Sequence, residues 1–298
     1  VQESIARQIV ASVAQRVREE QVESTKRRPL EDLRAYDLVL QANRLSDDFR
    51  PEAQAQIGLL LEQALRLDPS YARAFTGLAY FHFNFWLDGA LGVAVEDDEH
   101  AAKALHCAEQ GVVLDPNDPR CHSTLGFICV HSKQVERGLH HLELARSMNP
   151  NDALILTLWA WAQGCAGRHE VGLTAIETAM QINPRHPPWY RMYAARLLFS
   201  LGRYEESLLQ SGQYAGIPAR RVRHASFRIA AFAHLDRRAE AGRHFAEYEA
   251  QLRSLWKGRA GPTVDDFVAW SVEASCLVQE SDRDHLRTGM LIAMSEGR

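Results

Sequence analysis

Apolar residues recur three or four positions apart along most of the chain, and no run alternates strictly between apolar and polar residues. Near the start, Ile5, Ile9, Val13 and Val17 fall on one stripe, which predicts an amphipathic helix over residues 3–20. The same spacing predicts further helices over residues 33–45, 52–67, 72–86, 100–114, 189–201, 204–213, 219–235, 238–256, 264–278 and 282–294, with two regular helical hairpins ending at Pro150 and Pro184. The pattern therefore predicts an all-α protein.

Four prolines, each preceded by Asp or Asn, divide this helical pattern at regular distances. They are Pro69, Pro116, Pro150 and Pro184, and the last three are 34 residues apart. The first gap is 47 residues, which equals one such period plus an insertion of 13 that we place at residues 87–99. Proline ends a helix because it lacks an N–H and disfavours helical geometry in the residue before it. A 34-residue period of this kind is typical of an array of helix-turn-helix repeats.

The residues between the prolines carry a second pattern. In residues 119–150, Leu125 and Gly126 are seventh and eighth, and Leu142 and Ala145 are twenty-fourth and twenty-seventh. The equivalent residues of 153–184 are Trp159, Ala160, Ile176 and Ala179. Small residues are needed where the two helices of a repeat cross closely, and large apolar residues fill the gaps between successive helices.

These residues resemble the tetratricopeptide repeat (TPR). The resemblance implies a right-handed α-α superhelix, a TPR-like solenoid of about six helical hairpins with capping helices. We expect the array at residues 30–257, the capping helices at 258–298, and an N-terminal helix and linker at 1–29.

The groove of such an array is lined by the first helix of each pair, at repeat places two, five, nine and twelve. Tyr80, Phe127 and Trp161 share the ninth place of three successive repeats, which predicts an aromatic ladder on the concave face. Aromatic and Arg side chains are the usual anchors of protein interfaces. The predicted partner-binding residues are Arg73, Thr76, Tyr80, Phe83, Arg120, Ser123, Phe127, Trp161 and Arg191.

Two interpretations of the ladder stay open: a groove for a partner, or a surface covered by the chain's own helices, for example residues 3–20. Replacing Phe127 and Trp161 with Ala distinguishes them. Weaker partner binding with intact helical content would favour the groove, and lost folding would favour self-coverage.

Charge and cysteine content limit the class of function. The formal net charge is −4, so no global field attracts nucleic acid or a membrane surface. The most apolar stretch, residues 80–95, contains Asp88 and is too short to cross a bilayer. Five cysteines without a C-x-x-C pair favour buried free thiols in a cytoplasmic protein. The start at Val1 suggests a piece of a longer chain.

No catalytic, cofactor or metal site is predicted. The chain lacks phosphate-loop, dinucleotide-binding and nucleophile-elbow motifs, and its 13 His include no H-E-x-x-H. The Lys and Asn with which chaperone-binding TPRs grip a carboxylate are also missing, because the fifth and ninth places hold Thr76/Tyr80, Ser123/Phe127 and Thr157/Trp161.

Short terminal stretches resemble one group of bacterial signalling proteins. Residues 1–10 resemble the tail of their TolB-like region, residues 33–40 the entry to their TPR array, and residues 284–290 their closing helix. These proteins are class III adenylate cyclases with a C-terminal TPR region and winged-helix transcriptional regulators of similar build. The resemblance carries over no catalytic residue.

The sequence thus predicts a non-catalytic interaction module of a larger bacterial signalling protein, which binds a peptide or protein segment in its groove. The alternative is a structural or dimerisation arm of a cyclase or regulator, acting as a homodimer. An enzyme built on the solenoid has no support in the sequence.

Overall fold

The computed structural model describes residues 30–45, 51–89, 98–212, 218–256 and 261–296, and these contain helices and no strand. The expected N-terminal helix at 3–20 and most of the insertion lie outside these residues. The described helices are α2 (Leu30–Arg44), α3 (Pro51–Leu67), α4 (Ala72–Gly89), α5 (Asp98–Leu114), α6 (Pro119–His131), α7 (Val135–Met148), α8 (Ala153–Cys165), α9 (His169–Ile182), α10 (Trp189–Ser200), α11 (Tyr204–Gly212), α12 (Pro218–His234), α13 (Arg238–Leu255), α14 (Val264–Ala274) and α15 (Glu280–Glu296).

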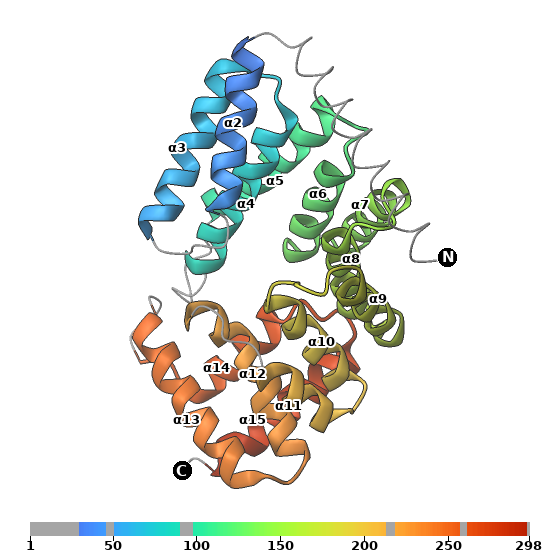
Figure 1. Ribbon diagram of the computed structural model, residues 1–298. Coiled ribbons are helices and arrows are strands. Elements are labelled where there is room, and N and C mark those ends of the chain that lie inside the picture. The colour runs from blue at the N-terminus through green and yellow to red at the C-terminus, as the bar shows by residue number, and fades with distance from the viewer. Residues whose placement is uncertain (1–29, 46–50, 90–97, 213–217, 257–260, 297–298) are drawn as a thin grey trace, which may run out of the picture.

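The helices pair along the chain into six hairpins, from α2/α3 to α12/α13, followed by α14/α15 (Figure 1). The first helix of each hairpin also packs against the first helix of the next, so α2, α4, α6, α8, α10 and α12 form a continuous inner row. Helix starts recur with the expected period, since α6 and α8 begin at residues 119 and 153, and α7 and α9 at 135 and 169. The predicted helical solenoid of about six hairpins is confirmed.

Glycine residues allow the two helices of a regular hairpin to pack closely. A Cβ added to Gly126 would lie 2.7 Å from the carbonyl oxygen of Gly138, and one added to Gly138 would lie 2.7 Å from that of Gly126. These two backbones therefore approach too closely for any other residue. The prediction that a small residue is needed where α6 and α7 cross is correct.

The turn inside each hairpin has the same backbone geometry in four successive repeats. Lys133, Gly167, Gly202 and Asp236 all have positive φ, at 64°, 84°, 72° and 58°. The residue after each one donates its backbone N–H to a carbonyl in the last turn of the first helix, as Gln134 does to Cys129 at 2.8 Å. This left-handed helix end satisfies backbone carbonyls that the helix leaves unpaired.

The hydrophobic side chains form two clusters. The first extends from α2 to α10 and also includes Cys276, and the second joins Phe199 of α10 to helices α12 to α15. In the second cluster, α15 packs against α12 and α13. The expected division of the chain at residues 257/258 stays a prediction.

One element differs from its prediction in a way that matters for the site. Helix α14 was expected to reach residue 278, but it ends at Ala274, and Cys276 then takes a left-handed conformation with φ 60°. The chain after Ala274 therefore turns back toward the array. Val278 donates its backbone N–H to the carbonyl of Cys165 at the end of α8, at 2.9 Å.

Candidate binding groove

The inner row of helices brings the predicted aromatic residues into one line. The ring centroids of Tyr80 and Phe127 are 6.1 Å apart, and those of Phe127 and Trp161 are 5.0 Å apart. Tyr193 of α10 extends the line, 5.7 Å from Trp161. Each ring comes from a different hairpin, so the aromatic ladder crosses four successive repeats.

Most of the ladder is covered. Phe127 is 5 % exposed and Trp161 is 2 % exposed, whereas Tyr80 is half-buried. The imidazole of His131 stacks on Trp161 with centroids 4.5 Å apart, and the Cys276 thiol lies 3.6 Å from Nδ1 of His131. The α14–α15 connection thus takes part in covering the ladder. Residues 3–20, which were considered for this role, lie outside the described chain.

Phe83, Thr76 and Ser123, predicted to bind a partner, are buried side chains with contacts inside the array. Phe83 lies edge-on to Phe127, with centroids 4.9 Å apart. Thr76 donates its hydroxyl to the carbonyl of Ala72 at 3.1 Å, and Ser123 donates to the carbonyl of Arg120 at 3.0 Å. These three residues shape the floor below the groove.

Two of the predicted arginines connect successive hairpins. Arg73 forms an ion pair with Asp118, the residue that caps the N-terminus of α6. One repeat later, Arg120 lies 3.7 Å from Asp152, the cap of α8. The side chains of Arg73 and Arg120 are nevertheless 42 % and 49 % exposed, so their outer edges can still contact a ligand.

Arg191, the third predicted arginine, is half-buried on α10. Its guanidinium donates to the side-chain carbonyl of Gln210 in α11 at 3.0 Å. It lies on the first helix of its hairpin, as expected, but it joins the two helices of that hairpin rather than successive repeats.

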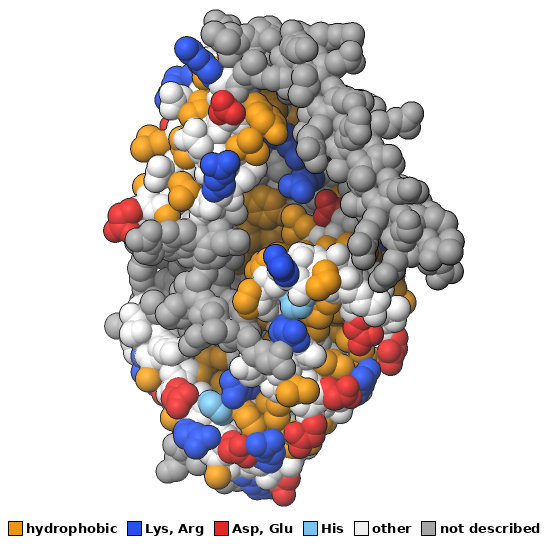
Figure 2. All heavy atoms as spheres, in the orientation of Figure 1, with side chains coloured by type: hydrophobic (Ala, Val, Ile, Leu, Met, Phe, Trp, Pro, Cys, Tyr) orange, Lys and Arg blue, Asp and Glu red, His pale blue; other side chains and the backbone are white. Residues whose placement is uncertain are grey.

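Tyrosine hydroxyls add polar groups beside the ladder. Burial raises the pKa of Tyr80 to about 12. A hydrogen bond with Thr124 and the positive charge of Arg120 lower this pKa, but by less than burial raises it. Burial also raises the pKa of Tyr190, which hydrogen-bonds Thr157. Both phenols therefore stay protonated at neutral pH, with their hydroxyls paired to threonines inside the array. Figure 2 shows a hollow on this face, floored by hydrophobic side chains and bordered by Lys and Arg.

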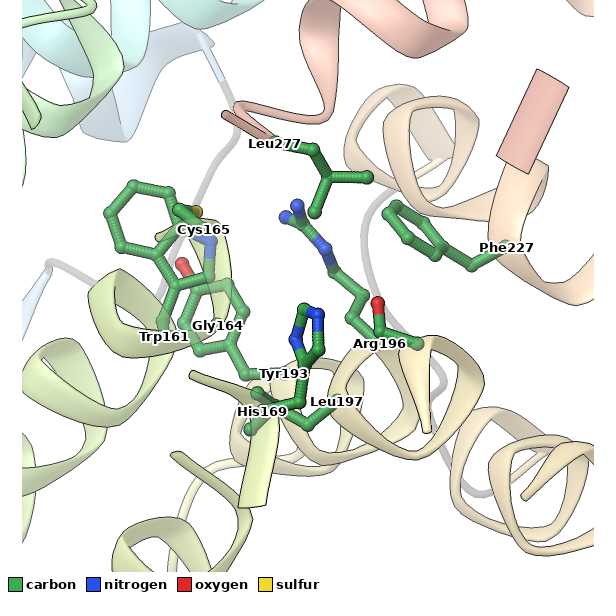
Figure 3. Close-up of a pocket in the computed structure, with 10 residues that line it drawn as sticks. Trp161, Gly164, Cys165, His169, Tyr193, Arg196, Leu197, Phe227 and Leu277 are labelled. Atoms are coloured by element: carbon green, nitrogen blue, oxygen red, sulfur yellow. The ribbon is translucent and has the colours of Figure 1, made fainter. Parts of the chain in front are cut away.

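The other end of the ladder is closed by the chain itself. A cavity of about 10 Å³ is lined by Trp161, Tyr193 and Arg196 from the array together with Leu277 from the α14–α15 connection (Figure 3). Arg196 is buried, and its guanidinium donates to the backbone carbonyl of Ser275. The indole N–H of Trp161 has no hydrogen-bond partner among the described residues.

Several residues of the groove were not predicted from the sequence. Asp118 and Asp152 are 34 residues apart, so the repeat period itself was a signal that they share a role. Tyr193 gave no such signal, because the regular spacing is lost after Pro184 and the ninth place of that repeat holds Ala195. His131 and Cys276 meet only in the folded chain.

Other kinds of site find no support among the described residues. No three His, Cys, Asp or Glu side chains of the described chain are grouped so that they could hold a metal ion. Within the same ranges, no helix is both long and apolar enough for a bilayer crossing.

Comparison with known proteins supports the fold. No protein-family model matches the chain, and no curated protein matches it. Among solved structures, a chain of the Cut9–Hcn1 hetero-tetramer of APC/C matches with a TM-score of 0.53 at 14% identity, over 76% of this chain and 47% of that one.

Two further structures are similar. PilW, a type IV pilus biogenesis factor, matches with a TM-score of 0.50 at 13% identity, over 72% of this chain and 96% of its own. A TPR protein of Thermus thermophilus has a TM-score of 0.48 at 16% identity, over 74% of this chain and 99% of its own. The chain has the helical solenoid fold of TPR proteins.

Proposed function

We propose that this chain is a non-catalytic scaffold that binds an extended segment of another protein along its inner row of helices. The observation that carries the proposal is the aromatic ladder, whose open end at Tyr80 lies beside half-exposed arginines. The Tyr80 ring supplies apolar contact area, and the half-exposed Arg guanidiniums can bind the backbone carbonyls and carboxylates of a peptide. The groove crosses several hairpins, as an extended ligand requires.

Peptide display followed by titration tests this proposal. Random peptides are selected on the immobilised chain, and one selected peptide is titrated against wild type, Tyr80→Ala, Arg120→Ala and Glu177→Ala. The first two variants should bind about tenfold more weakly, since they remove anchors at the open end of the ladder. Glu177, exposed on the second helix of its hairpin, is the matched control and should have no effect. Equal binding by all four chains would refute the proposed site.

The parent protein, the compartment and the oligomeric state are part of the same proposal. The short terminal resemblances support a role in a bacterial class III adenylate cyclase or a winged-helix regulator, in the cytoplasm and without direct contact to nucleic acid or membrane. The upstream reading frame tests the parent protein. Light scattering tests the homodimer: a mass near 33.6 kDa supports partner binding, and twice that mass supports a dimerisation arm.

A further inference from the structure

Residues 273–282, which we call the closing turn, join the end of α14 to the start of α15 and contact two successive hairpins of the array. Lys133, after α6, lies 2.9 Å from the Glu273 carboxylate and donates to the Glu273 backbone carbonyl at 2.7 Å. Further along, Val278 donates to the Cys165 carbonyl at 2.9 Å. Asp282 ends the contact, 2.9 Å from Nε2 of His169 at the start of α9. The closing turn therefore follows the array from one repeat to the next.

The contacts of the closing turn are those expected of a bound peptide. One branched aliphatic side chain, Leu277, is 5 % exposed and lines the same small cavity as Trp161. The backbone is held by hydrogen bonds to Cys165 and Arg196, which do not depend on its side chains. Carboxylates at both ends, Glu273 and Asp282, face a Lys and a His of the array.

The fit of the closing turn is incomplete in two respects. Cys276 has φ 60°, a conformation that favours Gly and disfavours Cys. The Trp161 indole N–H, in a side chain only 2 % exposed, lacks a partner in the described chain. An unpaired buried donor costs free energy that a ligand with an acceptor at this place would recover. A different segment could therefore bind here without the backbone strain and with one more hydrogen bond.

We propose that the closing turn is an intramolecular occupant of the closed end of the groove, and that the partner displaces it. The partner is then an extended protein segment with a branched aliphatic residue in the place of Leu277 and carboxylates on both sides of it. An acceptor on that segment pairs with the Trp161 N–H. This inference rests on the proposed function and names the chemistry of its ligand.

A peptide supplied in trans tests the displacement. A fluorescein-labelled peptide of residues 271–282, with Cys276→Ala, is titrated by anisotropy against the full wild-type chain and against Glu273→Gln/Asp282→Asn. The double variant loses both charged contacts between its own closing turn and the array, so its site is open for a larger fraction of the time. It should bind the labelled peptide about tenfold more tightly than wild type. A labelled peptide with Leu277→Asp should bind neither chain.

Equal binding to both chains, or to neither, would overturn the inference. Amide hydrogen exchange of wild type gives a second measurement that does not depend on the folding of the double variant. With the labelled peptide in excess, the Val278 amide should exchange faster, and an unchanged or slower rate would also overturn the inference. Failure here leaves the Tyr80 and Arg120 titration unaffected, so the two proposals fail separately.

Discussion

Trp161 lies at the centre of the ladder, between Phe127, His131 and Tyr193. Its side chain is 2 % exposed, so the packing of three hairpins depends on it as well as any ligand. Removing a large buried aromatic side chain leaves a cavity that the surrounding structure only partly fills. The residue therefore acts first as part of the core.

Trp161→Ala is expected to lower the free energy of unfolding by about 3–5 kcal/mol. Urea denaturation followed by circular dichroism measures the loss. Val171→Ala, at a side chain that is 48 % exposed, is the control and should change stability by less than about 0.5 kcal/mol. A Trp161→Ala chain as stable as wild type would show that the ladder is open to solvent.

The Asp118 carboxylate makes two stabilising interactions. It accepts the backbone N–H of Arg120 at 2.9 Å as the cap of α6, and it pairs with Arg73 of the preceding hairpin. Losing both should cost about 1–2 kcal/mol in Asp118→Ala. Asp118→Asn keeps an oxygen for the cap and should lose roughly half as much. Equal losses in the two variants, measured by urea denaturation, would mean that the cap contributes nothing beyond the ion pair.

At the scale of the helical hairpin, a pair of histidines joins the two helices within each of two successive hairpins. Nδ1 of His82 in α4 lies 3.0 Å from Nδ1 of His100 in α5, and Nδ1 of His122 in α6 lies 3.0 Å from Nδ1 of His141 in α7. Burial, and then the neighbouring His, lowers the pKa of His82 and that of His141 to about 4. Both histidines are therefore neutral in the folded chain at neutral pH.

These pKa values predict acid sensitivity. The unfolded chain binds protons at these histidines near pH 6.5, whereas the folded chain does so only near pH 4. Stability is therefore complete above about pH 6.5 and falls as the pH drops from there toward 4.

The thermal midpoint should accordingly be lower at pH 5 than at pH 7, and the double variant His82→Asn/His141→Asn should show a smaller difference. This pH range lies above that of the paired carboxylates, such as Glu143, whose pKa is lowered by Arg146. Equal midpoints at pH 5 and pH 7 in wild type would contradict the buried, neutral histidines.

The ends of the helices show how much of each hairpin the sequence could predict. The Asp-Pro and Asn-Pro pairs marked the ends of second helices, because the rule depends on local chain geometry alone. The end of α14 at Ala274 could not be predicted in this way. The residues that follow, Ser275, Cys276, Leu277 and Val278, include neither Gly nor Pro, and the positive φ of Cys276 is held by contacts with α8 and α10.

For the groove, the repeat period identified the residues that line up but not their exposure. Tyr80, Phe127 and Trp161 do contact one another in sequence order. The closing turn helps to bury the Trp161 end of the ladder, and it lies more than 100 residues away from Trp161 in the sequence, beyond the range of any repeat rule. The ion pairs of Arg73 and Arg120 with the cap of the next helix could not be predicted either, because they depend on how neighbouring hairpins are placed relative to each other.

At the scale of the whole molecule, the solenoid presents one inner wall whose two ends differ. The end at Tyr80, Arg73 and Arg120 is accessible, and the end at Trp161 is closed by residues 273–282. The two ends of the groove are therefore not equivalent for a ligand. A partner that binds first at the open end can then compete with the closing turn at the other.

A crystal structure of the chain with a display-selected peptide tests the central claim most directly. The account predicts a peptide lying across α4, α6 and α8, in contact with Tyr80 and Arg120. A peptide bound to the outer helices α5, α7 and α9, with the inner wall unchanged, would contradict it.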